Sequence, residues 1–144
     1  MSENANPHAN LNWLLEELVT GVVGARHAIV LSTDGMLIER SNGLPKDEAD
    51  QLAAMASALQ SLARGVGERF EGGLVRQNIV EMAHGFLFVT AAGEGACLAL
   101  LAEETADMGM IGYEMNRLVK RVRQHLSAAP RHTPVGAADG GLRA

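Results

Sequence analysis

The polar tetrad Ser32, Thr33, Asp34 and Gly35 holds residue types that could do chemistry, since a hydroxyl beside a carboxylate can serve as nucleophile and base. That chemistry also needs a base such as histidine, and the sequence gives no means of placing one near Ser32. Apolar runs flank the tetrad, and an Asp-Gly pair between such runs is the strongest short-range signal for a β-hairpin. We therefore predict a turn in which Gly35 adopts a positive φ and Asp34 favours the bend.

Other residues of reactive type are explained without a reaction. None of the five histidines stands at metal-ligand spacing from another histidine or from the cysteine. Cys97 falls within an apolar run, where a buried and unreactive thiol is expected. Paired carboxylates such as Glu16 and Glu17 lie on predicted helix surfaces, and no GxxxxGK[ST] phosphate loop is present. The sequence predicts no catalytic residue, no metal and no cofactor, and an enzyme is not expected.

Composition narrows the functional classes further. The 144 residues suit one domain with its own core, and a net charge of -5 argues against nucleic-acid binding. A single cysteine rules out an internal disulfide and suits a reducing compartment. The N-terminus lacks the pattern of a signal peptide, and no apolar run approaches the roughly 20 residues that span a bilayer. We expect a soluble, cytoplasmic protein with no membrane insertion.

Apolar residues recur at helical spacing in three segments and form five strand-like runs, which predicts the element order αββαβββα. The first expected helix starts near Asn10 or Asn12 and ends before Gly24. The second runs from Asp47 to Phe70, and the third runs from a cap at Thr105 or Asp107 to Leu126. The expected strands are HAIVLS, MLIERS, LVRQNIVEM, GFLFVTAA and ACLALLA. Aperiodic composition predicts disordered tails over 1–9 and 128–144, which leaves one domain over 10–127.

The composition of the strands indicates how the sheet is arranged. The runs AIVL, FLFV and ACLALL have no polar face, as expected of central strands, whereas MLIERS and VRQNIVEM alternate and suit the edges. Counted along the chain, the expected strand order of the antiparallel five-stranded sheet is 2-1-5-4-3. The helix over 47–70 joins the two edge strands and must cross one face, which leaves the other face to the remaining helices. The predicted fold class is α/β (α+β), a three-layer α/β/α sandwich.

The predicted edge strand over 74–82 is weakly protected against pairing with a copy of itself, because only Arg76 and Glu81 are charged. Small residues on the flanks of the helix over 47–70 either admit a second helix or are simply good helix formers. Antiparallel pairing of the edge strands about a two-fold axis would bring these flanks together, so we predict a homodimer. Its predicted interface comprises Ala53, Ala56, Val75, Gln77, Ile79 and Glu81, with Ile79 opposite its own copy.

Specific stretches of the sequence closely resemble the bacterial form of the roadblock/light chain 7 family. They are NWLLEELV, HAIVLSTDGMLIERSNGL, DQLAAMASALQSLARGVG, VRQNIVEM and GFLFVTAAGEGACLALLAEETADMGMIGYEMNRLV. The LSTDG turn and the ADMGMIGYEMNRL segment resemble versions found in actinobacterial operons of the conservon type. The resemblance implies the roadblock (profilin-like) fold.

The resemblance also implies a function. Such proteins are homodimers that bind a small Ras-like GTPase, as GTPase-activating or state-sensing partners, and in conservons they work beside a histidine-kinase-like protein. Activation is expected to reshape the switch residues of the GTPase, with no inserted arginine. The implied GTPase-binding surface is the exposed face of the helix over 47–70, at Asp50, Ala54, Ser57, Ser61, Arg64 and Glu68.

Two other functional classes stay open at this stage. A small-ligand sensory domain is the main alternative to a non-catalytic GTPase regulator or adaptor, and it requires a pocket with converging polar groups. An enzyme built on Ser32 and Asp34 would require a histidine within hydrogen-bond reach. Arg64 is the one residue of the implied surface that could act as an inserted arginine, and a solvated surface charge is the expected role.

Overall fold

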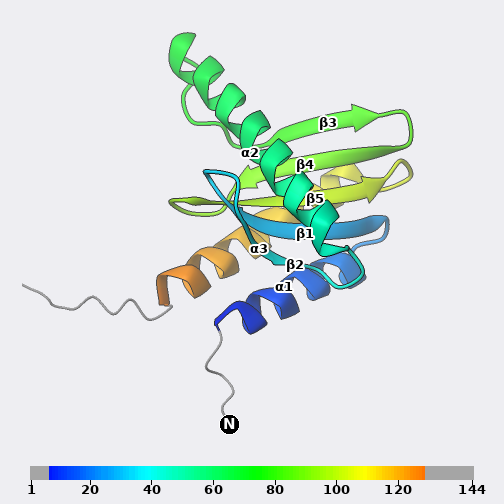
Figure 1. Ribbon diagram of the computed structural model, residues 1–144. Coiled ribbons are helices and arrows are strands. Elements are labelled where there is room, and N and C mark those ends of the chain that lie inside the picture. The colour runs from blue at the N-terminus through cyan, green and yellow to red at the C-terminus, as the bar shows by residue number, and fades with distance from the viewer. Residues whose placement is uncertain (1–6, 129–144) are drawn as a thin grey trace, which may run out of the picture.

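The computed structural model describes residues 7–128, and the chain folds in the predicted order of three helices and five strands (Figure 1). The elements are α1 (Pro7–Gly21), β1 (Ala25–Ser32), β2 (Leu37–Arg40), α2 (Lys46–Arg69), β3 (Asn78–Met82), β4 (Gly85–Ala91), β5 (Ala96–Glu103) and α3 (Met108–Ala128). Helix α1 begins at Pro7, before the predicted start, because proline suits a first turn whose N–H groups lack intrahelical partners. Nearly all of the two predicted tails lies outside the described residues.

The five strands form one antiparallel sheet in the order β2-β1-β5-β4-β3, as predicted. The central strands are β1 and β5, and Val30 pairs with Leu98. Strand β4 follows, with Val89 opposite Ala99, and β3 and β2 form the edges. The unbroken apolar runs are therefore central because both of their faces are covered.

Two hydrophobic cores lie on the two faces of the sheet. On one face, Leu15 of α1 and Met115 of α3 are fully buried with Phe88 of the sheet. On the other face, Leu52 of α2 packs with Ile29 and other strand residues. Figure 1 shows α2 crossing its face alone, while α1 and α3 lie side by side on the opposite face. The predicted three-layer sandwich is confirmed.

Strand β3 is shorter than predicted, because the chain turns back on α2 before the strand begins. Glu71 and Gly73 have positive φ values of 61° and 84°. The backbone N–H groups of Gly72 and Gly73 donate to the Gly67 carbonyl, at 2.8 and 3.3 Å. The hydroxyl of Thr90 then donates to the Arg76 carbonyl at 2.8 Å. This bond attaches the segment to β4 before the backbone hydrogen bonds between the two strands begin. Consequently the predicted interface residues Val75 and Gln77 lie in this connection, outside β3.

Candidate functional site

The Ser32–Gly35 tetrad forms a tight turn at the end of β1. Gly35 has a φ of 93°, and its N–H donates to the Ser32 carbonyl at 3.0 Å. The Ser32 hydroxyl donates to the Asp34 carboxylate, and it accepts from the Met36 N–H at 3.0 Å. Among the described residues, the side chain of Ser32 bonds only to Asp34 and Met36. The hydroxyl and carboxylate therefore stabilise the turn, as predicted.

This turn packs against α2. The Ser57 hydroxyl donates to the Thr33 carbonyl at 2.7 Å, and a Cβ added to Gly35 would lie 3.6 Å from Cβ of Ser57. The Thr33 N–H donates to the carbonyl of Gly95 at 3.0 Å, in the turn between β4 and β5. The hairpin turn therefore holds one flank of α2 beside the end of the sheet.

The inner face of α2 consists mainly of small residues. Ala49, Ala53 and Ala56 are fully buried, and Leu52 and Gln60 are nearly so. Because these inward-facing side chains are small, the helix backbone can lie close to the sheet. Ala53 and Ala56 were predicted to lie in a dimer interface, and that prediction is wrong because the sheet already covers them.

The large apolar side chains of α2 lie on a different side of the helix and are exposed. The exposed fractions are 60% for Met55, 72% for Leu62, 59% for Val66 and 72% for Phe70. With the half-buried Leu59, these residues follow one another at spacings of three and four, which defines one helical stripe. We call Met55, Leu59, Leu62, Val66 and Phe70 the apolar stripe. A contiguous row of exposed large apolar side chains on a helix usually marks an interaction site.

Strand β3 provides a free edge beside the apolar stripe. It pairs with β4 on one side, and no strand of the described chain pairs with its other side. The Asn78 side chain donates to that of Gln60 at 2.7 Å, which ties β3 to α2. Ile79 and Met82 are 44% and 45% exposed, and Glu81 is also exposed. Of the six predicted interface residues, only Ile79 and Glu81 lie on this strand.

The predicted GTPase-binding residues lie on the flank of α2 away from the apolar stripe. They are Asp50, Ala54, Ser57, Ser61, Arg64 and Glu68, which recur at spacings of three and four, and we call them the polar flank. All are exposed except Ser57, which is half-buried against the turn. Asp50 forms an ion pair of 2.9 Å with Lys46. The structure thus brings these six residues together on one surface.

Cys97 lies beneath this region in β5 and is 1% exposed. Burial raises the pKa of its thiol, and the positive charge of nearby Arg64 partly offsets that increase. The thiol is therefore neutral at physiological pH, and a neutral buried thiol is a poor nucleophile.

Within residues 7–128, no three His, Cys, Asp or Glu side chains are grouped as a metal ion would require, and no helix is long and apolar enough to cross a membrane.

The apolar stripe was not predicted as an exposed surface. Helical spacing predicted the helix over 47–70 but did not distinguish its two stripes. The alanines at 49, 53 and 56 are spaced four and three apart, as are Met55, Leu59 and Leu62. One helix can turn only one of these stripes toward a sheet, so the other had to be exposed.

An α/β/α sandwich with strand order 2-1-5-4-3 places the protein in the class of roadblock and profilin-like folds. Comparison with known families then identifies the group within that class. The chain belongs to the Roadblock/LC7 domain family, whose model matches residues 11–102.

The chain is also similar to solved structures and to other protein sequences. A Roadblock/LC7 domain from Streptomyces avermitilis is 47% identical, with a TM-score of 0.78 over 81% of this chain and 98% of that one. The gliding protein MglB from Thermus thermophilus shares the fold at 20% identity, with a TM-score of 0.77 over 90% of this chain and 96% of that one. An uncharacterised protein of Methanocaldococcus jannaschii is 29% identical over 101 residues, which are 69% of this chain and 86% of that protein.

Proposed function

We propose that the protein is a homodimeric, non-catalytic regulator or adaptor that binds a small Ras-like GTPase and modulates its nucleotide state. The observation that carries this proposal is the apolar stripe of α2 beside the free edge of β3. In a single chain, Leu62, Val66 and Phe70 are more than half exposed. A stable soluble protein rarely exposes several large apolar side chains in one contiguous patch.

A second copy of the chain can cover both features at once. Antiparallel pairing of two β3 strands about a two-fold axis would satisfy the free edge and continue the sheet across the dimer. The same axis would bring two apolar stripes together, and each large apolar side chain that is fully buried contributes about 1.5–3 kcal/mol. Figure 1 shows the C-terminal turns of α2 extending beyond the sheet, where a partner helix has room to pack. We retain Ile79 opposite its own copy as the proposed register.

The polar flank is the proposed platform for the GTPase, since it faces away from the apolar stripe and would stay exposed in such a dimer. It offers carboxylates at Asp50 and Glu68, a guanidinium at Arg64 and the small residues Ala54 and Ser61. Small side chains between charged ones allow another protein surface to approach closely. Family membership supports this partner, because the roadblock resemblance implies a Ras-like GTPase.

The experiment for this proposal is a binding titration. The protein is titrated with the Ras-like GTPase encoded near its gene, loaded with GDP or with a GTP analogue, and heat release is measured. We expect saturable binding that differs between the two states. Ser61→Arg in the polar flank should weaken binding at least tenfold, roughly 1.4 kcal/mol, whereas Asn116→Arg on α3 should not. Absence of binding in both nucleotide states would contradict the proposal.

Arg64 offers a test of whether the protein supplies a catalytic group. It is an exposed residue on a helix, and its charge acts on the nearby Cys97 thiol. If the protein stimulates GTP hydrolysis, Arg64→Ala should leave the stimulated rate unchanged within about twofold, since an inserted arginine contributes 10³-fold or more. A larger loss in single-turnover hydrolysis, with binding intact, would assign Arg64 a catalytic role.

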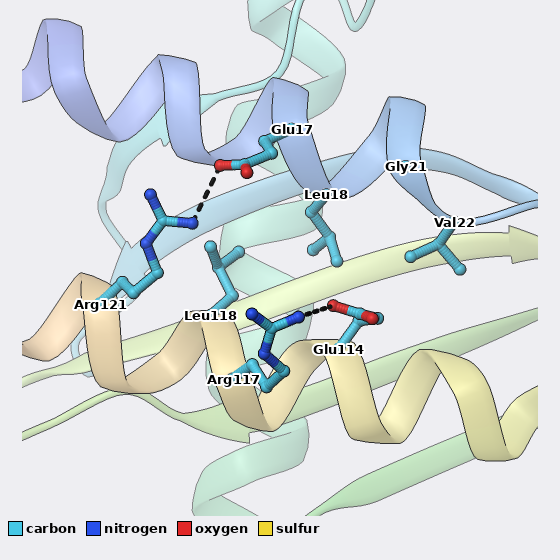
Figure 2. Close-up of a pocket in the computed structure, with 8 residues that line it drawn as sticks. All are labelled: Glu17, Leu18, Gly21, Val22, Glu114, Arg117, Leu118 and Arg121. Carbon is cyan, nitrogen blue, oxygen red and sulfur yellow. Dashed lines mark hydrogen bonds and ion pairs between the residues drawn. The ribbon is translucent and has the colours of Figure 1, made fainter.

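Further parts of the proposal concern the setting of the protein. We propose that it acts in the cytoplasm as one domain over 10–127, in a complex that includes a histidine-kinase-like protein, which can recruit it to a membrane. A small-ligand sensor requires a pocket with converging polar groups that are free to bind. In the groove between α1 and α3, which holds about 170 Å³, the charged side chains are paired with one another beside leucines (Figure 2).

A further inference from the structure

Helix α2 leaves part of its own face of the sheet uncovered (Figure 1). Three residues of β3, β4 and β5 pair across the strands there and lie in one row on this face, which we call the open row: Val80, Leu87 and Leu101. All three side chains are half-buried. Val89 and Ala99 form the next row, beneath α2, and they are fully buried. The open row is therefore apolar sheet surface that the helix of the same chain does not fully cover.

The apolar stripe lies on the side of α2 that faces the open row. The polar flank lies on the other side, where the Ser57 hydroxyl bonds to the Thr33 carbonyl in the turn after β1. The open row is level with the opposite end of β1, because Leu101 pairs with His27. At about 100° per residue, the stripe and the polar flank point in roughly opposite directions from the helix axis. The stripe and the open row are thus neighbouring parts of one apolar surface.

The C-terminal turns of α2 extend past the edge of the sheet (Figure 1). Gln60 bonds to Asn78 of the edge strand at 2.7 Å, and the helix continues from there to Arg69, with Phe70 directly after it. This continuation is roughly 14 Å long at 1.5 Å per residue. Three strand spacings of a sheet, at roughly 4.8 Å each, cover a similar width. The projecting turns are therefore long enough to cross β3, β4 and β5 of another copy.

Two-fold pairing of the β3 strands would direct these turns onto the open row of the second copy. In the register with Ile79 opposite its own copy, Asn78 of one copy lies opposite Val80 of the other. Since Gln60 is bonded to Asn78, α2 leaves its own sheet level with Val80 of the second copy. Beyond that point, the exposed C-terminal part of the apolar stripe would pass along the open row.

We propose that the C-terminal turns of each α2 dock on the open row of the other copy, with Val66 over Leu87 and Phe70 over Leu101. This inference rests on the homodimer in the proposed function and specifies which surfaces meet in it. The two-fold axis repeats the contact, so each copy both donates and receives a helix end. The docking covers exposed side chains of α2 and half-buried side chains of the sheet together.

Cross-linking between cysteines tests this arrangement. Cys97→Ala first removes the only cysteine of the chain, and Val66→Cys with Leu87→Cys are then introduced together. The protein is treated with a short bis-maleimide, and the linked peptides are identified by mass spectrometry. A covalent dimer on a denaturing gel reports a link between two copies. The matched control carries Glu68→Cys with Leu87→Cys, because Glu68 lies on the same helix end but on the polar flank.

We expect the 66–87 pair to give at least about tenfold more covalent dimer than the 68–87 pair, since the two helix positions face opposite ways. Phe70→Cys with Leu101→Cys provides a second pair if Leu87→Cys does not fold. Equal yields from the 66–87 and 68–87 pairs, or no 66–87 or 70–101 link in a protein with the molar mass of two copies, would overturn the docking and leave the homodimer intact. The molar mass of a single chain would overturn both.

Discussion

Gly35 shows how one residue fixes the β1–β2 hairpin. Its φ of 93° lies in the left-handed region, which residues with a Cβ adopt at a cost of about 1–2 kcal/mol. An added Cβ would meet Ser57 and Ala54 at ordinary contact distances, so the cost is backbone strain and not a steric clash. The Asp-Gly pair alone was enough to predict this turn, because the requirement is local.

Gly35→Ala should therefore lower the free energy of unfolding by about 1–2 kcal/mol. Gly65→Ala is the matched control, since Gly65 lies within α2 with open space around a new Cβ. There the same change should raise stability by about 0.5–1 kcal/mol. Urea denaturation measures both values. Equal effects of the two substitutions would contradict the assignment of strain to the turn.

Cys97 gives a prediction about pH. Its thiol has a raised pKa in the folded state, mainly because of burial, so above about pH 8.5 the unfolded chain loses this proton first. Stability from this group is complete below that pH and declines as the pH rises toward the folded-state pKa, by at most about 1.4 kcal/mol per pH unit. Chemical denaturation between pH 7 and 10 should show a steeper decline for the native protein than for Cys97→Ala. Identical slopes would show that the thiol does not titrate in this way.

At the scale of elements, α2 carries the clearest difference between sequence and structure. Its existence and extent followed from helical spacing, and the observed Lys46–Arg69 agrees closely with the predicted Asp47–Phe70. Which stripe would face the sheet did not follow, because the burial of a helix face depends on how closely the sheet surface can approach. The alanine face allows the closer approach, and the larger residues stay exposed.

The β3 edge was predicted in type but not in length. Alternating residues correctly indicated an edge strand, yet Val75 and Gln77 fall before it. The reason is the return of the chain at Gly72 and Gly73, whose N–H groups bond to α2 instead of entering a ladder. Backbone bonds between a loop and a helix leave little trace in residue periodicity, which explains the shift in the predicted interface.

The apolar stripe yields a prediction at this scale. Leu62→Asp should convert the proposed dimer to a monomer, since it places two charges in the interface, while the 72% exposed side chain contributes little to the fold of one chain. The helical circular dichroism should remain. Ser61→Asp is the control, one residue along on the polar flank, and should stay dimeric in sedimentation velocity runs. Equal sedimentation coefficients of the two variants would show that the apolar stripe does not take part in dimerisation.

For the whole molecule, strand order and layer arrangement were predictable from the sequence. Continuous apolar runs identified the central strands, and runs that alternate between apolar and polar residues identified the edge strands. The long helix that joins the two edge strands had to cross one face of the sheet. Surfaces were less predictable, because exposure is a property of the packed molecule. The groove beside Trp13 is the example: its residues come from α1 and α3, which are distant in sequence and meet only in the fold.

The α2 layer carries both the proposed dimer contact and the proposed GTPase platform (Figure 1). The sheet between this layer and the α1–α3 layer has a hydrophobic core on each face.

We propose that two copies of this chain associate through the apolar stripe and the β3 edge. The most direct test is the molar mass in solution, measured by light scattering on a size-exclusion column at micromolar concentration. We predict twice the 15.2 kDa of one chain. A molar mass equal to that of a single chain would contradict the account.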